Sequence, residues 1–136
     1  MLSGRLLGVS EGQVMKRFLY ACVTLALVAL ISWGAMTAIP PIPKIVPHQD
    51  KLEHVLAFGA LTLWLTVLFG PRRISWTVVL ASGGALALEI SQGLFSDKRE
   101  GDIADLSASL FGIAMAGLSL LALRELIRRR QRAIAR

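Results

Sequence analysis

The stretch EISQGLFSDKREGDIAD, residues 89–105, concentrates polar side chains between two long apolar runs, residues 74–95 and 103–123. Glu89 lies within the first of these runs. A carboxylate at the centre of a bilayer costs about 2.5–3.5 kcal/mol even on the most lenient insertion scale, so such residues usually face a protein interior or a watery cavity. The sequence therefore predicts that Glu89 belongs to a polar site between packed helices.

The chain as a whole is too apolar for a soluble domain. Its 136 residues are 54% hydrophobic, and four runs dominate, residues 18–39, 52–69, 74–95 and 103–123. An α-helix rises about 1.5 Å per residue, so these runs can cross a hydrocarbon core of about 30 Å, the second run only barely. Strict alternation of apolar and polar residues is absent, which favours helices over a barrel. We expect an all-α membrane protein, a four-transmembrane-helix bundle.

The net charge of +6 is distributed unevenly along the chain. Eleven of the fifteen basic residues fall at the termini and between the second and third runs: Arg5, Lys16, Arg17, Arg72, Arg73, Arg124, Arg128, Arg129, Arg130, Arg132 and Arg136. The positive-inside rule then places both termini in the cytoplasm and the other two loops outside. We expect a cytoplasmic leader (1–17), a membrane domain (18–123) and a basic cytoplasmic tail (124–136) on anionic headgroups, and no nucleic-acid partner.

The sequence gives little support for a metal site or a cofactor. Cys22 is the only cysteine, so it can form neither an intrachain disulfide nor a cysteine pair for a metal. The carboxylates around His54 lack the spacing typical of metal ligands. We expect no metal and no cofactor.

A second polar segment, DKLEH, precedes the second apolar run. Asp50 is a good N-cap type, and it lies four residues before His54, on the same helix face. A carboxylate at that spacing can hold one imidazole nitrogen and leave the other free, as a general base requires. The alternative is a capping aspartate next to an interfacial histidine, with no chemistry.

Two stripes of small residues predict close helix packing. The first follows the third run at four-residue spacing and comprises Gly83, Ala87 and Ser91, near the neighbouring pair Glu89 and Gln92. The second follows the fourth run and comprises Ala104, Ala108, Gly112 and Ala116.

Together, DKLEHVLAFGAL, EISQ and the R-x5-D spacing resemble the VanZ-like family of small bacterial membrane proteins. The family pattern falls on Asp50, Lys51, His54, Phe58, Glu89, Gln92, Arg99, Asp105 and Gly112. Ser109 stands where the family has asparagine, and a hydroxyl can still donate and accept. The resemblance covers half of the chain and implies a multi-pass protein of the bacterial cytoplasmic (inner) membrane. The family is named for a protein associated with teicoplanin resistance, but the resemblance implies no reaction.

The chemistry of these residues suggests a function. With Asp50 orienting it, His54 is a candidate general base, and Glu89 is a candidate proton donor. Asp105 can pair with Arg99 or serve as a second base. Lys51 and Arg99 can hold an anionic group, and Gln92 and Ser109 complete the predicted substrate contacts. An outward-facing site of this kind suits a membrane lipid that carries phosphate, such as a polyprenyl-phosphate-linked precursor of the cell envelope.

Two other classes remain open. In the first, the chain is a non-catalytic scaffold or a lipid- or antibiotic-binding protein, and its polar residues form a structural network. In the second, it is a proton-linked transporter, which four short helices could form only as a homo-oligomer.

Overall fold

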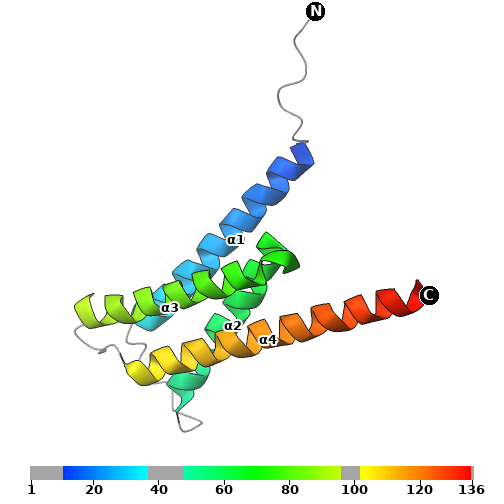
Figure 1. Cartoon of the computed structure of the whole chain (residues 1–136). Helices are drawn as coiled ribbons and strands as arrows, with labels where there is room; N and C mark the ends of the chain where they lie inside the picture. The colour runs from blue at the N-terminus through cyan, green and yellow to red at the C-terminus, as the bar shows by residue number, and fades with distance from the viewer. Residues whose placement is uncertain (1–10, 37–47, 96–101, 136) are drawn as a thin grey trace, which may run out of the picture.

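Four long α-helices make up the fold (Figure 1). A computed structural model describes residues 11–36, 48–95 and 102–135. The helices are α1 (Glu11–Met36), α2 (Gln49–Phe69), α3 (Ile74–Phe95) and α4 (Ile103–Ile134), and the short 3-10 turn η1 (Pro71–Arg73) joins α2 to α3. No strand occurs among these residues, which confirms the predicted all-α, four-helix architecture.

Each of the four helices is long and apolar enough to cross a membrane, which supports a multi-pass membrane protein. α3 begins and ends as predicted, and α2 begins three residues early. α1 begins at Glu11, and residues 37–39 of the predicted run lie outside the described residues. α4 continues past residue 123 to Ile134, because the arginine-rich tail is itself a good helix former. The pair Glu125–Arg129, with a nitrogen–oxygen distance of 2.9 Å, supports this last part.

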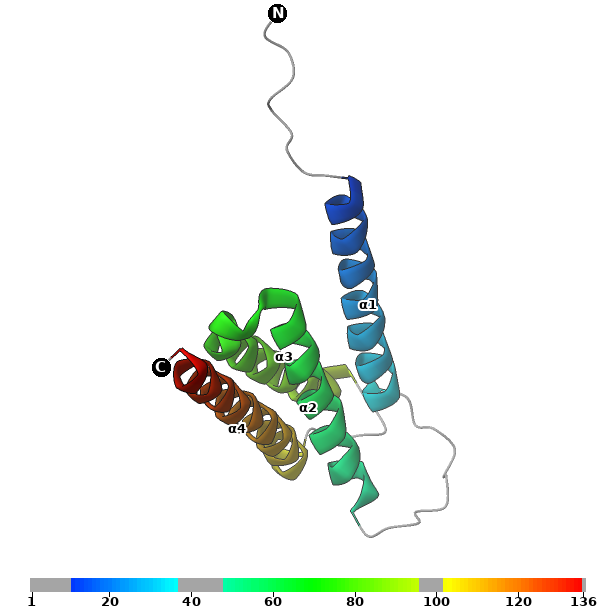
Figure 2. The ribbon, with the colours of Figure 1, turned by 90° about the vertical axis from the view of Figure 1, so that its right-hand side faces the viewer.

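The C-terminal ends of α1 and α3 lie at the same end of the molecule as the N-terminal ends of α2 and α4 (Figures 1 and 2). α1 contacts this group from Tyr20 onward, where the Tyr20 and Trp64 rings meet edge to face, and its N-terminal end extends beyond the other helices (Figure 2). Within the described ranges, two hydrogen bonds tie α1 to the other helices. Trp64 Nε1 donates to Thr24 Oγ1 at 3.0 Å, and Gln92 Nε2 donates to the Ala35 carbonyl at 2.9 Å.

α2 and α4 approach each other closely at Gly112. A Cβ atom built there would lie 2.9 Å from the Cα and the carbonyl carbon of Val55, so only glycine fits. Ile113 and Ala116 continue the buried face, and the half-buried Ala108 precedes it, but Ala104 is exposed. The predicted stripe on α4 is therefore confirmed from residue 108 onward.

The predicted stripe on α3 is wrong. Gly83 and Ala87 are exposed, and a Cβ at Gly83 would meet nothing within 4 Å. The small residues that do face the interior are Ala81 and Ala85, which lie on the same face as Leu88. A spacing of four residues shows which residues share a helix face, but it does not show whether that face points toward the interior or away from it. Here the packing of α3 against α2 and α4 decides which face of α3 is buried.

Candidate functional site

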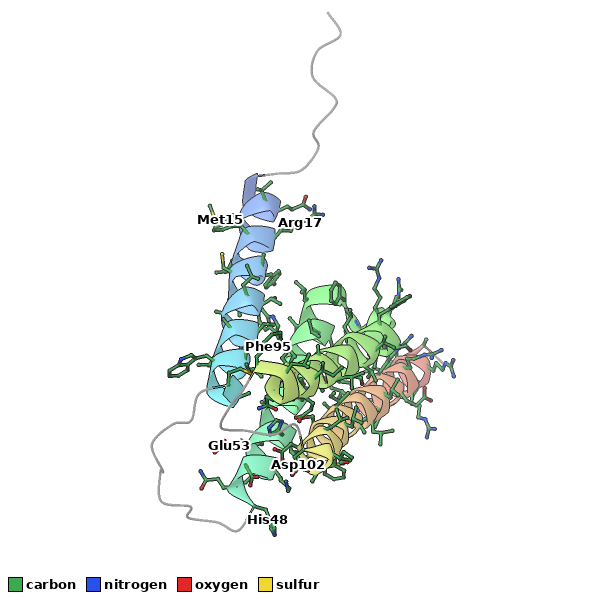
Figure 3. All side chains as sticks on the ribbon, turned by 90° about the vertical axis from the view of Figure 1, so that its left-hand side faces the viewer. Met15, Arg17, His48, Glu53, Phe95 and Asp102 are labelled. Atoms are coloured by element: carbon green, nitrogen blue, oxygen red, sulfur yellow. The ribbon has the colours of Figure 1, made fainter. Side chains whose placement is uncertain are left out.

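Polar side chains from three helices converge where α2 and α4 begin and α3 ends. We call this set the polar cluster, and it comprises Lys51, His54, Glu89, Asp102, Asp105 and Ser109 (Figure 3 labels Asp102). The sequence predicted five of these six residues as site residues. Arg99, the remaining predicted cation, lies outside the described residues.

Lys51 links α2 to the start of α4. Its ammonium nitrogen lies 2.7 Å from Asp105 Oδ1 and 3.1 Å from Asp102 Oδ2. The Asp50 carboxylate lies 3.7 Å from the same nitrogen. Charge-assisted bonds of this length are among the stronger ones in proteins. The Lys51 ammonium is therefore already neutralised by its own chain and is poorly placed to bind an external anion.

Asp102 is the residue that sequence reasoning missed. Its side chain caps α4, since Oδ1 accepts from the Ala104 backbone N–H at 2.8 Å. That hydrogen bond, and secondarily the Lys51 ammonium, hold the pKa of Asp102 below its usual range. An aspartate directly before an apolar helix is a typical N-cap, and this signal could have identified it.

The His54 imidazole lies between two carboxylates. Nδ1 lies 3.0 Å from Ser109 Oγ and 3.9 Å from Glu89 Oε1, and Nε2 lies 3.8 Å from Asp105 Oδ2. The ring is buried and stacks on Phe58. The His54 ring is therefore the point at which acids from α3 and α4 approach α2.

Glu89 is the most deeply placed acid of the polar cluster. Its side chain is 8% exposed, and Oε2 accepts the Asp102 backbone N–H at 3.0 Å. The other oxygen, Oε1, is buried and has no hydrogen-bond partner in the part of the chain that the structure describes. Native proteins rarely leave such an atom unpaired, so Oε1 is an unsatisfied acceptor within the polar cluster.

Asp50 is not the N-cap of α2. The helix begins one residue earlier, at Gln49, and His48 occupies the cap with a left-handed φ of 59°. Asp50 lies instead in the first turn, where a carboxylate still interacts favourably with the helix dipole. Its role in orienting His54 stays a prediction.

Gln92 is buried, and its amide connects α3 to the end of α1. Its predicted contact with a substrate stays a prediction, as does that of Ser109, whose hydroxyl is fully buried against His54.

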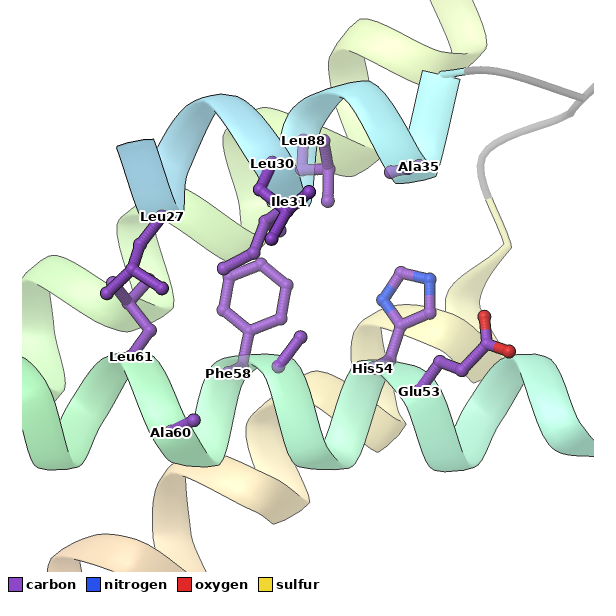
Figure 4. A pocket seen from close by; sticks show the side chains of 12 residues that line it. Leu27, Leu30, Ile31, Ala35, Glu53, His54, Phe58, Ala60, Leu61 and Leu88 are labelled. Atoms are coloured by element: carbon purple, nitrogen blue, oxygen red, sulfur yellow. The ribbon is translucent and has the colours of Figure 1, made fainter. Parts of the chain in front are cut away.

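A cavity of about 330 Å³ lies between α1, α2 and α3 and reaches His54 (Figure 4). Phe58 and His54 project from α2 toward α1 in this view. Apart from Glu53 and His54, the lining of the cavity is apolar and comprises Leu27, Leu30, Ile31, Gly34, Ala35, Ala57, Phe58, Ala60, Leu61 and Leu88. Glu89 is not part of the lining, and its Oε1 lies 3.9 Å from His54 Nδ1. The cavity thus offers an apolar volume with two polar lining residues, His54 and Glu53.

Between residues 11 and 135, leaving out the gaps at 37–47 and 96–101, no three His, Cys, Asp or Glu side chains are arranged to hold a metal ion.

Comparison with known proteins gave no relative: no family model, no curated protein and no solved structure matches the chain.

Proposed function

We propose that this chain is a VanZ-like protein of the bacterial cytoplasmic membrane that binds, and acts on, a lipid-linked or phosphorylated precursor of the cell envelope. One observation carries this proposal: the cavity between α1, α2 and α3 has an apolar lining in which His54 and Glu53 are the polar residues. A ligand that fills such a volume needs a hydrocarbon part for the lining and a polar group for the imidazole. An isoprenoid or acyl lipid has this composition.

Charge distribution supports an outward-facing polar cluster. At the opposite end of the molecule, the described basic residues gather on the start of α1, on η1 and on the tail of α4: Lys16, Arg17, Arg72, Arg73, Arg124, Arg128, Arg129, Arg130 and Arg132. Cytoplasmic loops carry such an excess of lysine and arginine. In the proposed orientation both termini are cytoplasmic, and the polar cluster meets the outer headgroup layer, where lipid-linked precursors are used.

His54 is the residue that we assign to the chemistry. Its imidazole contacts the cavity, and Glu89 and Asp105 lie on its two sides at 3.9 and 3.8 Å. In transfer or hydrolysis of the ligand's phosphate, His54 would accept the proton of the hydroxyl or water that attacks phosphorus, and would return it to the leaving oxygen as the phosphorus–oxygen bond to that oxygen breaks. The two carboxylates would stabilise the imidazolium that forms. Arg99 is the cation that would hold a phosphate in this proposal, because the Lys51 ammonium is already bonded to Asp102 and Asp105.

The proposal is tested with a matched pair of histidine variants, His54→Asn and His48→Asn. Both remove one imidazole at the same end of α2, but only His54 lines the cavity, and asparagine tolerates the left-handed conformation at position 48. The purified full chain is incubated with undecaprenyl phosphate and phosphatidylcholine, and bound lipid is counted by native mass spectrometry. We expect His54→Asn to lose the preference for the polyprenyl lipid and His48→Asn to keep it.

Catalysis is tested separately with Glu89→Gln, which keeps the size of the side chain and removes its charge. We expect turnover of a lipid-linked precursor to fall at least tenfold in Glu89→Gln and in His54→Asn, at unchanged expression. Full turnover in both variants would eliminate the catalytic part. In cells, overproduction of the wild-type chain should lower teicoplanin susceptibility if the resemblance extends to resistance.

A second candidate function is a scaffold or a lipid- or antibiotic-binding protein without catalysis. The bonds from Lys51 to Asp102 and Asp105 favour a scaffold, because they join α2 to α4 across the polar cluster. If the chain is a scaffold, the wild type shows no turnover, and His54→Asn lowers the thermal stability of the chain without changing its lipid preference.

A further inference from the structure

A second, smaller pocket lies at the other end of the molecule, beside η1. It has a volume of about 230 Å³ and is lined by Phe69 from α2, Arg73 from η1, and Trp76 and Leu80 from α3. The turn that forms it depends on Gly70, whose φ of 86° strongly favours glycine, and on Pro71 at the start of η1. The pocket therefore has a fixed backbone frame, and none of its lining belongs to the polar cluster.

The surroundings of this pocket are strongly positive. Arg72 is the chain neighbour of Arg73, and Arg124 Nη1 approaches the Pro71 carbonyl at 3.5 Å, which brings a guanidinium of α4 to the same turn. Glu125, the acidic residue next to Arg124, is paired with Arg129 at 2.9 Å. The guanidinium of Arg73 therefore faces a pocket whose nearby charges favour an anion.

The other three lining residues have the chemistry of a membrane interface. Trp76 is 66% exposed, Leu80 is 50% exposed and Phe69 is 40% exposed. Indole rings favour the headgroup level of a bilayer, where one edge is wet and the other apolar. Leu80 lies one helical turn further along α3 than Trp76, in the direction of the hydrocarbon. The pocket thus passes from a guanidinium, through aromatic rings, to an aliphatic side chain.

We propose that this pocket binds the head of an anionic phospholipid of the bilayer, with phosphatidylglycerol as the representative. Arg73 contacts the phosphodiester, since a guanidinium presents two parallel donors to phosphate oxygens. Trp76 and Phe69 contact the glycerol region, and Leu80 contacts the beginning of an acyl chain. The site is independent of the cavity at His54 and survives if the proposed function fails.

A matched pair of variants, Arg73→Gln and Arg132→Gln, tests the proposal, because each removes one exposed positive charge at the same end of the molecule. The full chain in detergent is titrated with phosphatidylglycerol, and bound lipid is counted by native mass spectrometry. A basic residue near an anionic surface contributes about 1 kcal/mol, which corresponds to about fivefold in affinity. We expect Arg73→Gln to weaken binding about fivefold and Arg132→Gln less than twofold.

Equal weakening by the two variants would overturn the proposal, since it would show diffuse attraction to the basic end and no defined site. Binding unchanged in Arg73→Gln would overturn it as well. If Arg73→Gln does not fold, Arg73→Lys keeps the charge and removes the fork, and we expect a loss of about twofold. Two further arms test the ligand: phosphatidylcholine and free glycerol phosphate should both bind at least fivefold more weakly than phosphatidylglycerol, and equal binding of either contradicts the assignment.

Discussion

Gly112→Ala tests whether α2 and α4 must touch backbone to backbone beside the polar cluster. The added Cβ would lie 2.9 Å from two backbone carbons of Val55, where ordinary contact begins at 3.4 Å. The atoms in the way belong to a helix backbone and cannot rotate aside. The two helices must therefore separate by at least several tenths of an ångström.

The expected cost follows from two opposing terms. Overpacking of a tight interface costs about 1–3 kcal/mol. Alanine is favoured over glycine in a helix interior by about 1 kcal/mol, which offsets part of it. We expect a net loss of about 0–2 kcal/mol in the free energy of unfolding, toward the upper end because the obstructing atoms are backbone. Because Ser109 lies one turn before Gly112, and His54 is the neighbour of Val55, the same shift lengthens the 3.0 Å contact between Ser109 Oγ and His54 Nδ1.

The measurement is unfolding of the purified chain in detergent, with Gly83→Ala as the matched control. Gly83 lies in the interior of α3 on an exposed face, and an added Cβ there meets nothing within 4 Å. The control should be neutral or more stable than the wild type. If Gly112→Ala proves as stable as Gly83→Ala, the close approach of α2 and α4 does not limit the fold, and the reasoning is refuted.

Two more substitutions test the contacts that hold the cavity and the polar cluster. Trp64→Phe removes the indole N–H that donates to Thr24 and keeps only a six-membered aromatic ring. We expect the free energy of unfolding to fall by about 0.6 kcal/mol, typical of a hydrogen bond between membrane helices, and α1 to be cleaved more readily in limited proteolysis. An unchanged digestion pattern would contradict this. Lys51→Met leaves the half-buried Asp105 without its cation, so we expect a lower melting temperature. Adding Asp105→Asn to this variant should partly restore the melting temperature. No restoration in the double variant would show that the two side chains are not coupled.

Hydropathy was sufficient to predict the four helices, because each run is long, apolar and separated by loops or by Gly70-Pro71. The helix ends were harder to predict. The tail from Arg124 onward carries charges that end a hydrophobic run, yet the same residues favour helix, and the pair Glu125–Arg129 continues it. Hydropathy marks where apolar character ends, whereas backbone hydrogen bonding decides where the helix ends.

The convergence of Lys51, His54, Glu89 and Asp105 was predictable, because topology alone places the ends of α2, α3 and α4 at one side. The pairing within this set was not. Sequence spacing suggested Asp50 as a partner of His54, which stays a prediction, and it did not indicate the three side chains that the structure shows around the ring, Ser109, Glu89 and Asp105. Local spacing describes contacts within one helix, but these three partners come from two other helices, whose rotations depend on packing.

The charge of the polar cluster constrains what it can bind. With every carboxylate ionised, Glu89, Asp102 and Asp105 carry three negative charges, the neighbouring Asp50 adds a fourth, and the Lys51 ammonium offsets one of the four. A protonated His54 leaves the described groups with a net charge of minus two. An anionic headgroup therefore needs a cation beyond those of the described residues, and Arg99, outside them, is the predicted candidate. The Lys51 ammonium cannot serve this purpose while Asp102 and Asp105 hold it, and His54 is the member of the polar cluster that lines the cavity.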